Sequence, residues 1–431
     1  MLGAFANAFR TPDLRRKLLF VLFIITLFRL GSQVPAPGVN VANVQACFRQ
    51  IENDGLYGLI NLFSGGALLQ LTVFALGIMP YITASIILQL LVVVIPRLEA
   101  LKKEGQAGQT KITQYTRYLT LALAVLQATG IVALARSRQL LQGCPDALLY
   151  NEDKISTMLI MVITMTAGTA VIMWFGELIT DRGIGNGMSI LIFTQVVATF
   201  PSALWQVKVS RGWWVFGLVM AIGLVLVAAV IFMEQGQRRI PVQYARRMVG
   251  RKMFGGSSTY IPLKVNQAGI IPVIFASSLL YLPAMAVQFS SDGEGWAGWI
   301  STYLVSGSHP IYMATYFLLI IFFTYFYVAI TFNPQEVADN MKKYGGFIPG
   351  IRAGKPTEEY LNYVLSRITL PGALYLGLIS LVPLIALVLV NANQNFPFGG
   401  TSILIMVGVA LDTVKQIESQ LQQRNYEGFL R

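Results

Sequence analysis

The sequence predicts an all-α membrane protein that crosses a bilayer ten times. Two observations support this fold class. The 431 residues are 55% hydrophobic and only 12% charged, with a mean hydropathy of +0.61, far from the composition of an average soluble domain. The apolar residues also gather in long runs, and about 20 consecutive apolar residues suffice for one helical crossing.

The candidate spans follow one another along the whole chain, and some of them are short or interrupted. The first is preceded by a basic segment, residues 1–17, in which Pro12 suits the start of a helix. In order, the spans are residues 18–34, 68–95, 119–135, 155–175, 184–200, 213–233, 268–287, 311–332, 370–390 and 401–411.

The stretch from residue 55 to residue 96 is the most unusual. An apolar segment too short to span a bilayer, residues 56–63, ends at a Ser-Gly-Gly break, and the helix that follows contains Pro80, where we expect a bend. Interrupted backbone is tolerated at membrane depth only inside protein or beside a water-filled cavity. The pattern therefore favours a re-entrant half-helix inside a channel or transporter.

The basic residues predict the orientation, because basic loops stay in the cytoplasm. Most of the 32 Lys and Arg fall in alternate loops, starting with the N-terminal segment, so both termini are expected in the cytoplasm. Cys47 and Cys144 then lie in outer loops. We expect both to be unpaired structural cysteines, and a disulfide is the alternative.

Ten spans divide into two sets of five, which we expect as an N-terminal half, residues 1–200, and a C-terminal half, residues 201–431. An odd number of spans in each half makes the second half inverted relative to the first, an arrangement common in transport proteins. Two long basic inner segments, residues 234–264 and 333–367, belong to the C-terminal half. They either only orient the chain and attract anionic lipid, or they dock a cytosolic partner.

Catalytic and metal-binding chemistry is nearly absent from the sequence. His309 is the single histidine, which excludes histidine triads and H-E-x-x-H metal sites. The run PGIRAGKPT at residues 349–357 lacks the first glycine and the Ser or Thr of a phosphate-binding loop. We therefore expect no enzyme activity, no cofactor and no metal.

Two functional classes remain: a passive channel driven by partners, and an ion- or solute-coupled secondary transporter with an inverted repeat. Coupled carriers usually keep charged groups at mid-membrane depth. The ionisable residues of the spans all lie near span ends, which lowers the carrier hypothesis: Arg29, Glu177, Glu234 and Asp412.

Several motifs of this chain resemble the bacterial SecY family of protein-conducting channels, and they are spread over essentially its whole length. They read LFSGGAL, ALGIMPYITASIILQLL, KEGQAGQTKITQYTRY, GELITDRGIGNGMSILIF, EQGQRRIPVQYA, PLKVNQAGIIPVIFASS, FNPQEVADNMKKYGGFIPGIR and FGGTSILIMVGVALD. The resemblance implies a clamshell of two five-helix halves around an hourglass pore, acting as the central subunit of the translocon. That subunit conducts unfolded secretory proteins and releases transmembrane segments laterally into lipid.

The resemblance also assigns the pore and its plug. The matching plug is the re-entrant segment at about residues 56–66, with Leu56, Leu59, Ile60, Leu62, Phe63, Ser64, Gly65 and Gly66. The matching pore ring is Ile78, Ile82, Ile192, Ile274 and Ile405. From the residues alone, each of these Ile would be read as ordinary helix packing.

The resemblance places a lateral gate between the second and third helices on one side and the seventh and eighth on the other. Its polar residues are Thr83, Gln127 and Asn266, whose mutual hydrogen bonds we expect to favour the closed state. Polar side chains in apolar helices also serve plain packing, and that alternative stays open.

The long inner segments match the family's docking surface, on which the family depends most on the position of Arg352. Ala353 stands where many relatives carry Pro, which bears on the rigidity of the loop. The docking residues are Arg238, Arg239, Arg246, Arg247, Arg251, Lys252, Lys342, Lys343, Arg352 and Lys355. The implied partners are SecE, SecG, the SecA ATPase, the ribosome, signal sequences, nascent polypeptides and membrane lipid, in a bacterial cell membrane.

Overall fold

The computed structural model describes residues 11–44, 71–136, 149–150, 154–244, 247–249, 252–254, 258–288, 296–305, 309–390 and 400–427. The helices are α2 (Pro12–Gly31), α5 (Met79–Val94), α6 (Pro96–Lys103), α7 (Gln106–Arg136), α8 (Ile155–Arg182), α9 (Gly187–Gln235), α10 (Ile271–Gln288), α11 (Trp296–Ile300), the π-helix η1 (Ser301–Val305), α12 (Pro310–Thr331), α13 (Pro334–Lys343), α14 (Lys355–Val390) and α15 (Gly400–Glu427). The strands are β1 (Gln237–Tyr244), β2 (Arg247–Val249), β3 (Lys252–Phe254), β4 (Ser258–Lys264) and β5 (Gly346–Phe347).

The mostly helical fold class is confirmed, and every predicted span overlaps a helix. Among the described residues, five helices are long and apolar enough to cross a membrane, or six if α5 and α6, bent by 99°, count as one span. The number of ten crossings stays a prediction. Helices α7, α14 and α15 are longer than the predicted spans that they contain. Their polar and charged ends continue the helix beyond the apolar run.

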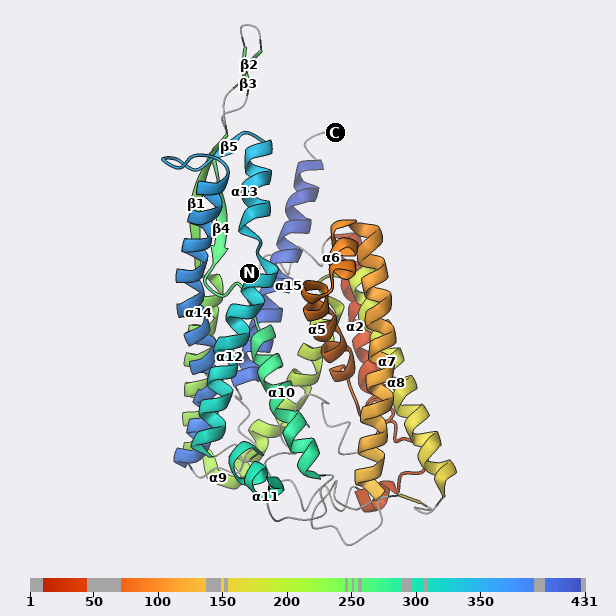
Figure 1. The fold of residues 1–431 in the computed structure, drawn as a ribbon. Coiled ribbons are helices and arrows are strands. Elements are labelled where there is room, and N and C mark those ends of the chain that lie inside the picture. The colour runs from red at the N-terminus through yellow and green to blue at the C-terminus, as the bar shows by residue number, and fades with distance from the viewer. Residues whose placement is uncertain are drawn as a thin grey trace.

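Figure 1 shows two groups of helices side by side. Helices α2, α5, α6, α7 and α8 stand on the right, and α10, α12, α13 and α14 stand on the left, with α9 passing across the lower end. Within the groups, α7 packs on α5 and α8, and α12 packs on α10 and α14, while α9 and α15 also pack together. One cluster of apolar residues joins α2, the start of α5, α8, α9 and α15.

A break at Gly212 turns the chain inside α9. This glycine has φ 80° and ψ 179°, a backbone region that is essentially restricted to glycine. The residues on either side are helical, so α9 consists of two helices meeting at this joint. They correspond to the fifth and sixth predicted spans.

Pro80 does not bend a helix, which corrects the expectation for the second span. Residues 71–78 form turns and a short bridge, with Gly77 at φ 55°, and α5 begins at Met79. Pro80 therefore lies in the first turn, where its missing N–H costs no helical hydrogen bond. The sharp bend comes later, between α5 and α6, where Pro96 starts the second helix.

The two long inner segments contain a small sheet that the sequence analysis did not foresee. Strand β1 pairs antiparallel with β4 over seven residue pairs, from Gln237 opposite Lys264 to Gln243 opposite Ser258. On its other edge β1 pairs with β5 through two residue pairs. The strand order is β4-β1-β5, and β2 and β3 form a separate two-stranded ribbon beyond it. The end of the molecule that carries this sheet, uppermost in Figure 1, is called the sheet end below.

Candidate functional site

The five predicted ring residues lie at or near the starts of four helices, α5, α9, α10 and α15. Ile78 directly precedes α5 as its N-cap residue, and Ile82 lies in the first turn of that helix. Ile192, Ile274 and Ile405 lie within the first two turns of α9, α10 and α15. The predicted ring therefore draws its side chains from both groups of helices.

These five side chains meet in adjoining apolar clusters. Ile78, Ile192 and Ile405 are 1%, 6% and 1% exposed and belong to one cluster, against which Ile82 packs. Ile274, 4% exposed, belongs to a second cluster, and Ile82 packs against that one too. The five residues, which come from well-separated stretches of the sequence, are therefore close together in the structure.

A buried layer of branched apolar side chains excludes water and ions by dewetting. The five isoleucine side chains themselves carry no polar group that would bind a passing molecule tightly. Ile270 packs against both clusters as well. The sequence analysis missed this residue, although it stands in the same motif as Ile274, one turn earlier.

The predicted gate residues Thr83, Gln127 and Asn266 are not joined by hydrogen bonds within the part of the chain that the structure describes, which corrects that expectation. The Thr83 hydroxyl donates to the Met79 carbonyl of its own helix at 2.9 Å. A hydroxyl bonded within its own helix cannot also hold a neighbouring helix through that proton.

Asn266 makes two hydrogen bonds that the sequence analysis did not foresee. It is 3% exposed, and its amide nitrogen donates to a carboxylate oxygen of Glu234 and to the Gly269 carbonyl. Glu234 lies in the last turn of α9 and Gly269 stands two residues before α10, so the Asn266 side chain links the end of one helix to the approach to the next. Spacing in the sequence could not reveal the pair, because the sheet-forming segment separates the two residues.

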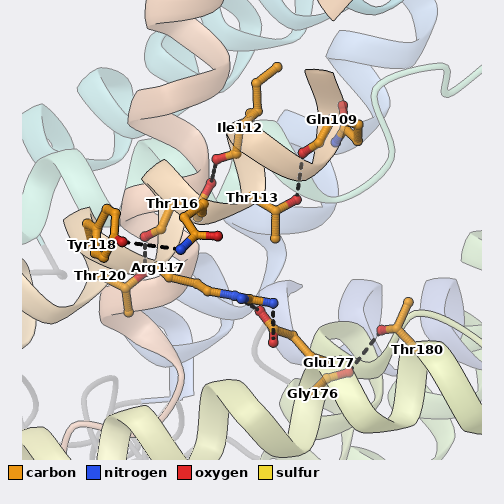
Figure 2. A network of polar contacts seen from close by, with 11 residues as sticks. Gln109, Ile112, Thr113, Thr116, Arg117, Tyr118, Thr120, Gly176, Glu177 and Thr180 are labelled. Carbon is orange, nitrogen blue, oxygen red and sulfur yellow. Dashed lines mark hydrogen bonds and ion pairs between the residues drawn. The ribbon is translucent and has the colours of Figure 1, made fainter. Parts of the chain in front are cut away.

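An ion pair joins α7 to α8, as Figure 2 shows. The Arg117 guanidinium donates to both carboxylate oxygens of Glu177, from Nε at 2.7 Å and from Nη2 at 2.8 Å. One turn further along α8, the Thr180 hydroxyl donates to the Gly176 carbonyl and accepts from the Gly187 N–H that opens α9. Glu177, one of the charges that the sequence analysis noted at span ends, is therefore engaged in a structural contact.

The basic inner segments expose their charges around the sheet. Ile240 and Val242 are buried in a cluster with residues of α13 and α14, whereas the residues of β1 from Gln237 to Arg239, Pro241 and Gln243 are exposed. Arg239 lies over the ring of Tyr260 on β4, 4.9 Å from its centroid. The exposed docking residues are Arg238, Arg239, Lys342, Lys343, Arg352 and Lys355.

The loop that carries Arg352 is tied down by its neighbours. The buried Thr357 hydroxyl donates to the Arg352 carbonyl at 2.8 Å, and the Thr357 N–H donates to the Gly354 carbonyl at 2.9 Å. Ala353 stands exposed between them. The backbone around Arg352 is thus held by hydrogen bonds without a proline.

Other predicted site residues cannot be placed. The plug segment, residues 56–66, lies outside the described residues, as do Arg246, Arg251, Cys47 and Cys144. Arg247 and Lys252 lie in β2 and β3. Within the described ranges, no group of three or more His, Cys, Asp or Glu residues could hold a metal ion.

The chain matches known proteins along its whole length. The family model described as SecY matches residues 72–414. The chain is 70% identical to the protein translocase subunit SecY of Streptomyces scabiei and 61% identical to that of Mycobacterium tuberculosis, each time over 100% of both chains.

Solved structures share the fold. A structure of a protein-conducting channel gives a TM-score of 0.63 at 18% identity, covering 94% of this chain and 91% of that one. Sec61 in a canine ribosome–channel complex from the endoplasmic reticulum gives 0.60 at 18% identity, with the same coverage. On the identity and coverage of its relatives, this chain belongs to the SecY family.

Proposed function

We propose that this chain is the channel subunit of a membrane protein translocase. It conducts unfolded polypeptides between its two helix groups and releases apolar segments sideways into lipid. The observation that carries this proposal is the convergence of Ile78, Ile192 and Ile405 with Ile82 and Ile274 in adjoining buried apolar clusters. Relatives at 61–70% identity are named translocase subunits, and structures with this fold are channels.

The ring residues act as the constriction in this proposal. Branched apolar side chains seal against ions when they are in contact, and an extended polypeptide can separate them because no strong bond is broken. We assign the role of the plug to the segment at residues 56–66, which lies outside the described residues. In another SecY protein, whose structure is similar to this one, the plug domain stabilises the closed state of the translocation channel and maintains a membrane seal.

Docking is assigned to the sheet end. Its exposed basic residues suit a partner with negative charge, such as ribosomal RNA, through release of counterions. Two structures that share the fold are of ribosome-bound complexes: Sec61 in a canine ribosome–channel complex, and the yeast Ssh1 complex on the 80S ribosome. The proposed partners are SecE, SecG, SecA and the ribosome, with signal sequences and nascent chains as substrates, in a bacterial cell membrane with both termini in the cytoplasm.

A solute carrier is not favoured. Carriers place charged groups at the depth of the substrate site, whereas the five side chains that converge here are all isoleucines. The ion pair of Arg117 with Glu177 joins α7 to α8, two helices of one group, and each charge has its partner in the other. Solute uptake by the purified chain alone would restore the carrier hypothesis.

The test is import of a signal-sequence-bearing protein into proteoliposomes that hold this chain with SecE and SecG. We expect import that requires both SecA and ATP. Arg352→Glu should abolish it by reversing the charge at the docking loop. Lys102→Glu, an equal change of charge at an exposed site on α6, is the matched control. Import without SecA, or normal import by the Arg352 variant, would contradict the proposal.

A further inference from the structure

Within the described part of the chain, two buried polar side chains that lie three residues from ring isoleucines have no hydrogen-bond partner. Gln195 on α9 is 1% exposed, and neither its amide nitrogen nor its amide oxygen is paired. Ser402 on α15 is fully buried, and its hydroxyl is also unpaired. Buried polar atoms in proteins are nearly always hydrogen-bonded, so such exceptions need an explanation.

The two helices run in opposite directions past each other. Ile184, just before α9, packs with Ile417 near the end of α15. A methyl group built on Gly185 would lie 3.6 Å from the Thr413 hydroxyl. The start of α9 therefore stands beside the later part of α15, and residue numbers rise on one helix as they fall on the other.

This antiparallel register puts the unpaired groups on one side of the ring isoleucines. Ile192 and Ile405 share one buried cluster, and Gln195 and Ser402 each lie three residues further along these antiparallel helices, on the same side of that cluster. Three residues correspond to about 4.5 Å along a helix. That side faces away from the sheet end, since Asp412 of α15 reaches Lys264 of β4 at 3.9 Å.

We propose that Gln195 and Ser402 form a polar layer that lowers the free energy of opening the Ile ring. The closed state leaves their three polar atoms dry, which is unfavourable. When the ring separates, these atoms gain partners from water or from the backbone amides of a polypeptide in transit. This inference rests on the proposed channel function.

The chemistry suits a surface along which a polypeptide slides. A carboxamide offers a donor and an acceptor, as a backbone peptide group does, and a hydroxyl offers both as well. Neither is charged, so neither binds a passing chain tightly. The layer would ease opening for any sequence without retaining it.

Two variants remove the unpaired groups with little change of shape: Gln195→Met and Ser402→Ala. The matched control is Thr194→Val on the same turn of α9. Thr194 is also buried, but its hydroxyl already donates to the Ile190 carbonyl at 2.8 Å. The control removes a buried hydroxyl that is satisfied in the closed state, so it should change opening little.

The experiment records single-channel openings of the complex with its partner subunits in a planar bilayer, with and without a signal peptide. We expect Gln195→Met to lower the opening frequency by about tenfold, which corresponds to about 1.4 kcal/mol, and Ser402→Ala to lower it in the same direction. A fall without peptide assigns the partner to water, and a fall only with peptide assigns it to the chain in transit. Both results support the layer.

A second readout is the unfolding temperature of the closed complex in detergent. Gln195→Met should raise it, because a dry polar group is replaced by an apolar one of similar size. Unchanged openings in Gln195→Met, an equal fall in Thr194→Val, or a lowered unfolding temperature would each overturn the proposal. If the unaltered complex itself never opens, the proposed channel function is wrong. If the unaltered complex opens but the Gln195 and Ser402 variants behave like it, only the polar layer is wrong.

Discussion

The pair of Arg117 with Glu177 makes a quantitative prediction about the helix group that contains α7 and α8. Both oxygens of the carboxylate are engaged, at 2.7 and 2.8 Å, but the two side chains differ in exposure, 43% for Arg117 and 21% for Glu177. Exposed pairs contribute about 0.2–1 kcal/mol, and breaking a fully buried pair costs about 3–5 kcal/mol. This pair lies between these limits.

Removing either charge should therefore have unequal effects. In Glu177→Gln the arginine, which is nearly half exposed, can turn to water, and we expect a loss of about 1 kcal/mol in the free energy of unfolding. In Arg117→Gln the less exposed carboxylate is left without its ionic partner, and we expect about 2 kcal/mol. The difference follows from which ion can recover its hydration.

The assay is thermal unfolding of the purified complex in detergent for both single variants, the double variant and the charge-swapped pair Arg117→Glu with Glu177→Arg. The double variant should cost less than the sum of the singles, and the swapped pair should recover part of the loss. At about 0.5 M salt, the differences in unfolding temperature between the variants and the unaltered complex should become smaller, because the ion pair is partly exposed to solvent and salt screens it. Equal losses in the two single variants, or strict additivity, would refute this account of the ion pair.

Three further predictions concern other parts of the structure. Ile405→Gly should raise ion leak through reconstituted channels, while Ile403→Gly, at an equally buried site on the same helix but in a different cluster, should not; equal leak would remove the ring assignment. Thr357→Val should weaken SecA binding by freeing the Arg352 carbonyl, and Thr357→Ser should restore it; identical binding by the two variants would separate the loop's backbone from docking. His309→Ala should lower the free energy of unfolding by about 1 kcal/mol, because the His309 ring accepts a hydrogen bond from the Ile311 N–H as the N-cap of α12. His309→Asn should leave the free energy of unfolding unchanged in the same assay. An alanine variant as stable as the unaltered protein would show that the cap contributes nothing.

The helices were predictable because long apolar runs have few other stable arrangements in a membrane. The residues at which the helices begin were harder to predict. Residues 71–78 are as apolar as the helix that follows, and composition does not distinguish turns from helix there; only Gly77, with its positive φ, and Pro80 in the first turn mark the boundary. A proline inside an apolar run was read as a bend, although the first turn of a helix accepts it at no cost.

The sheet had a readable signal that its charges concealed. Ile240 and Val242 alternate with polar residues in β1 and are buried, which is the period of a half-exposed strand. The pore ring, in contrast, could be named only through family resemblance, since its residues come from four helices and each resembles ordinary core. The pair of Asn266 with Glu234 depends on how distant segments fold back, which no local pattern records.

The pairing of β1 with β5 has a consequence for how this protein varies among its relatives. Gln243 stands opposite Phe347, and Tyr244 stands opposite Gly346, although these positions are far apart in the chain. A substitution on one strand changes the surface that its partner strand must fit. The two inner segments should therefore accumulate compensating changes together, and a segment transplanted from a distant relative should work only when its counterpart is transplanted with it.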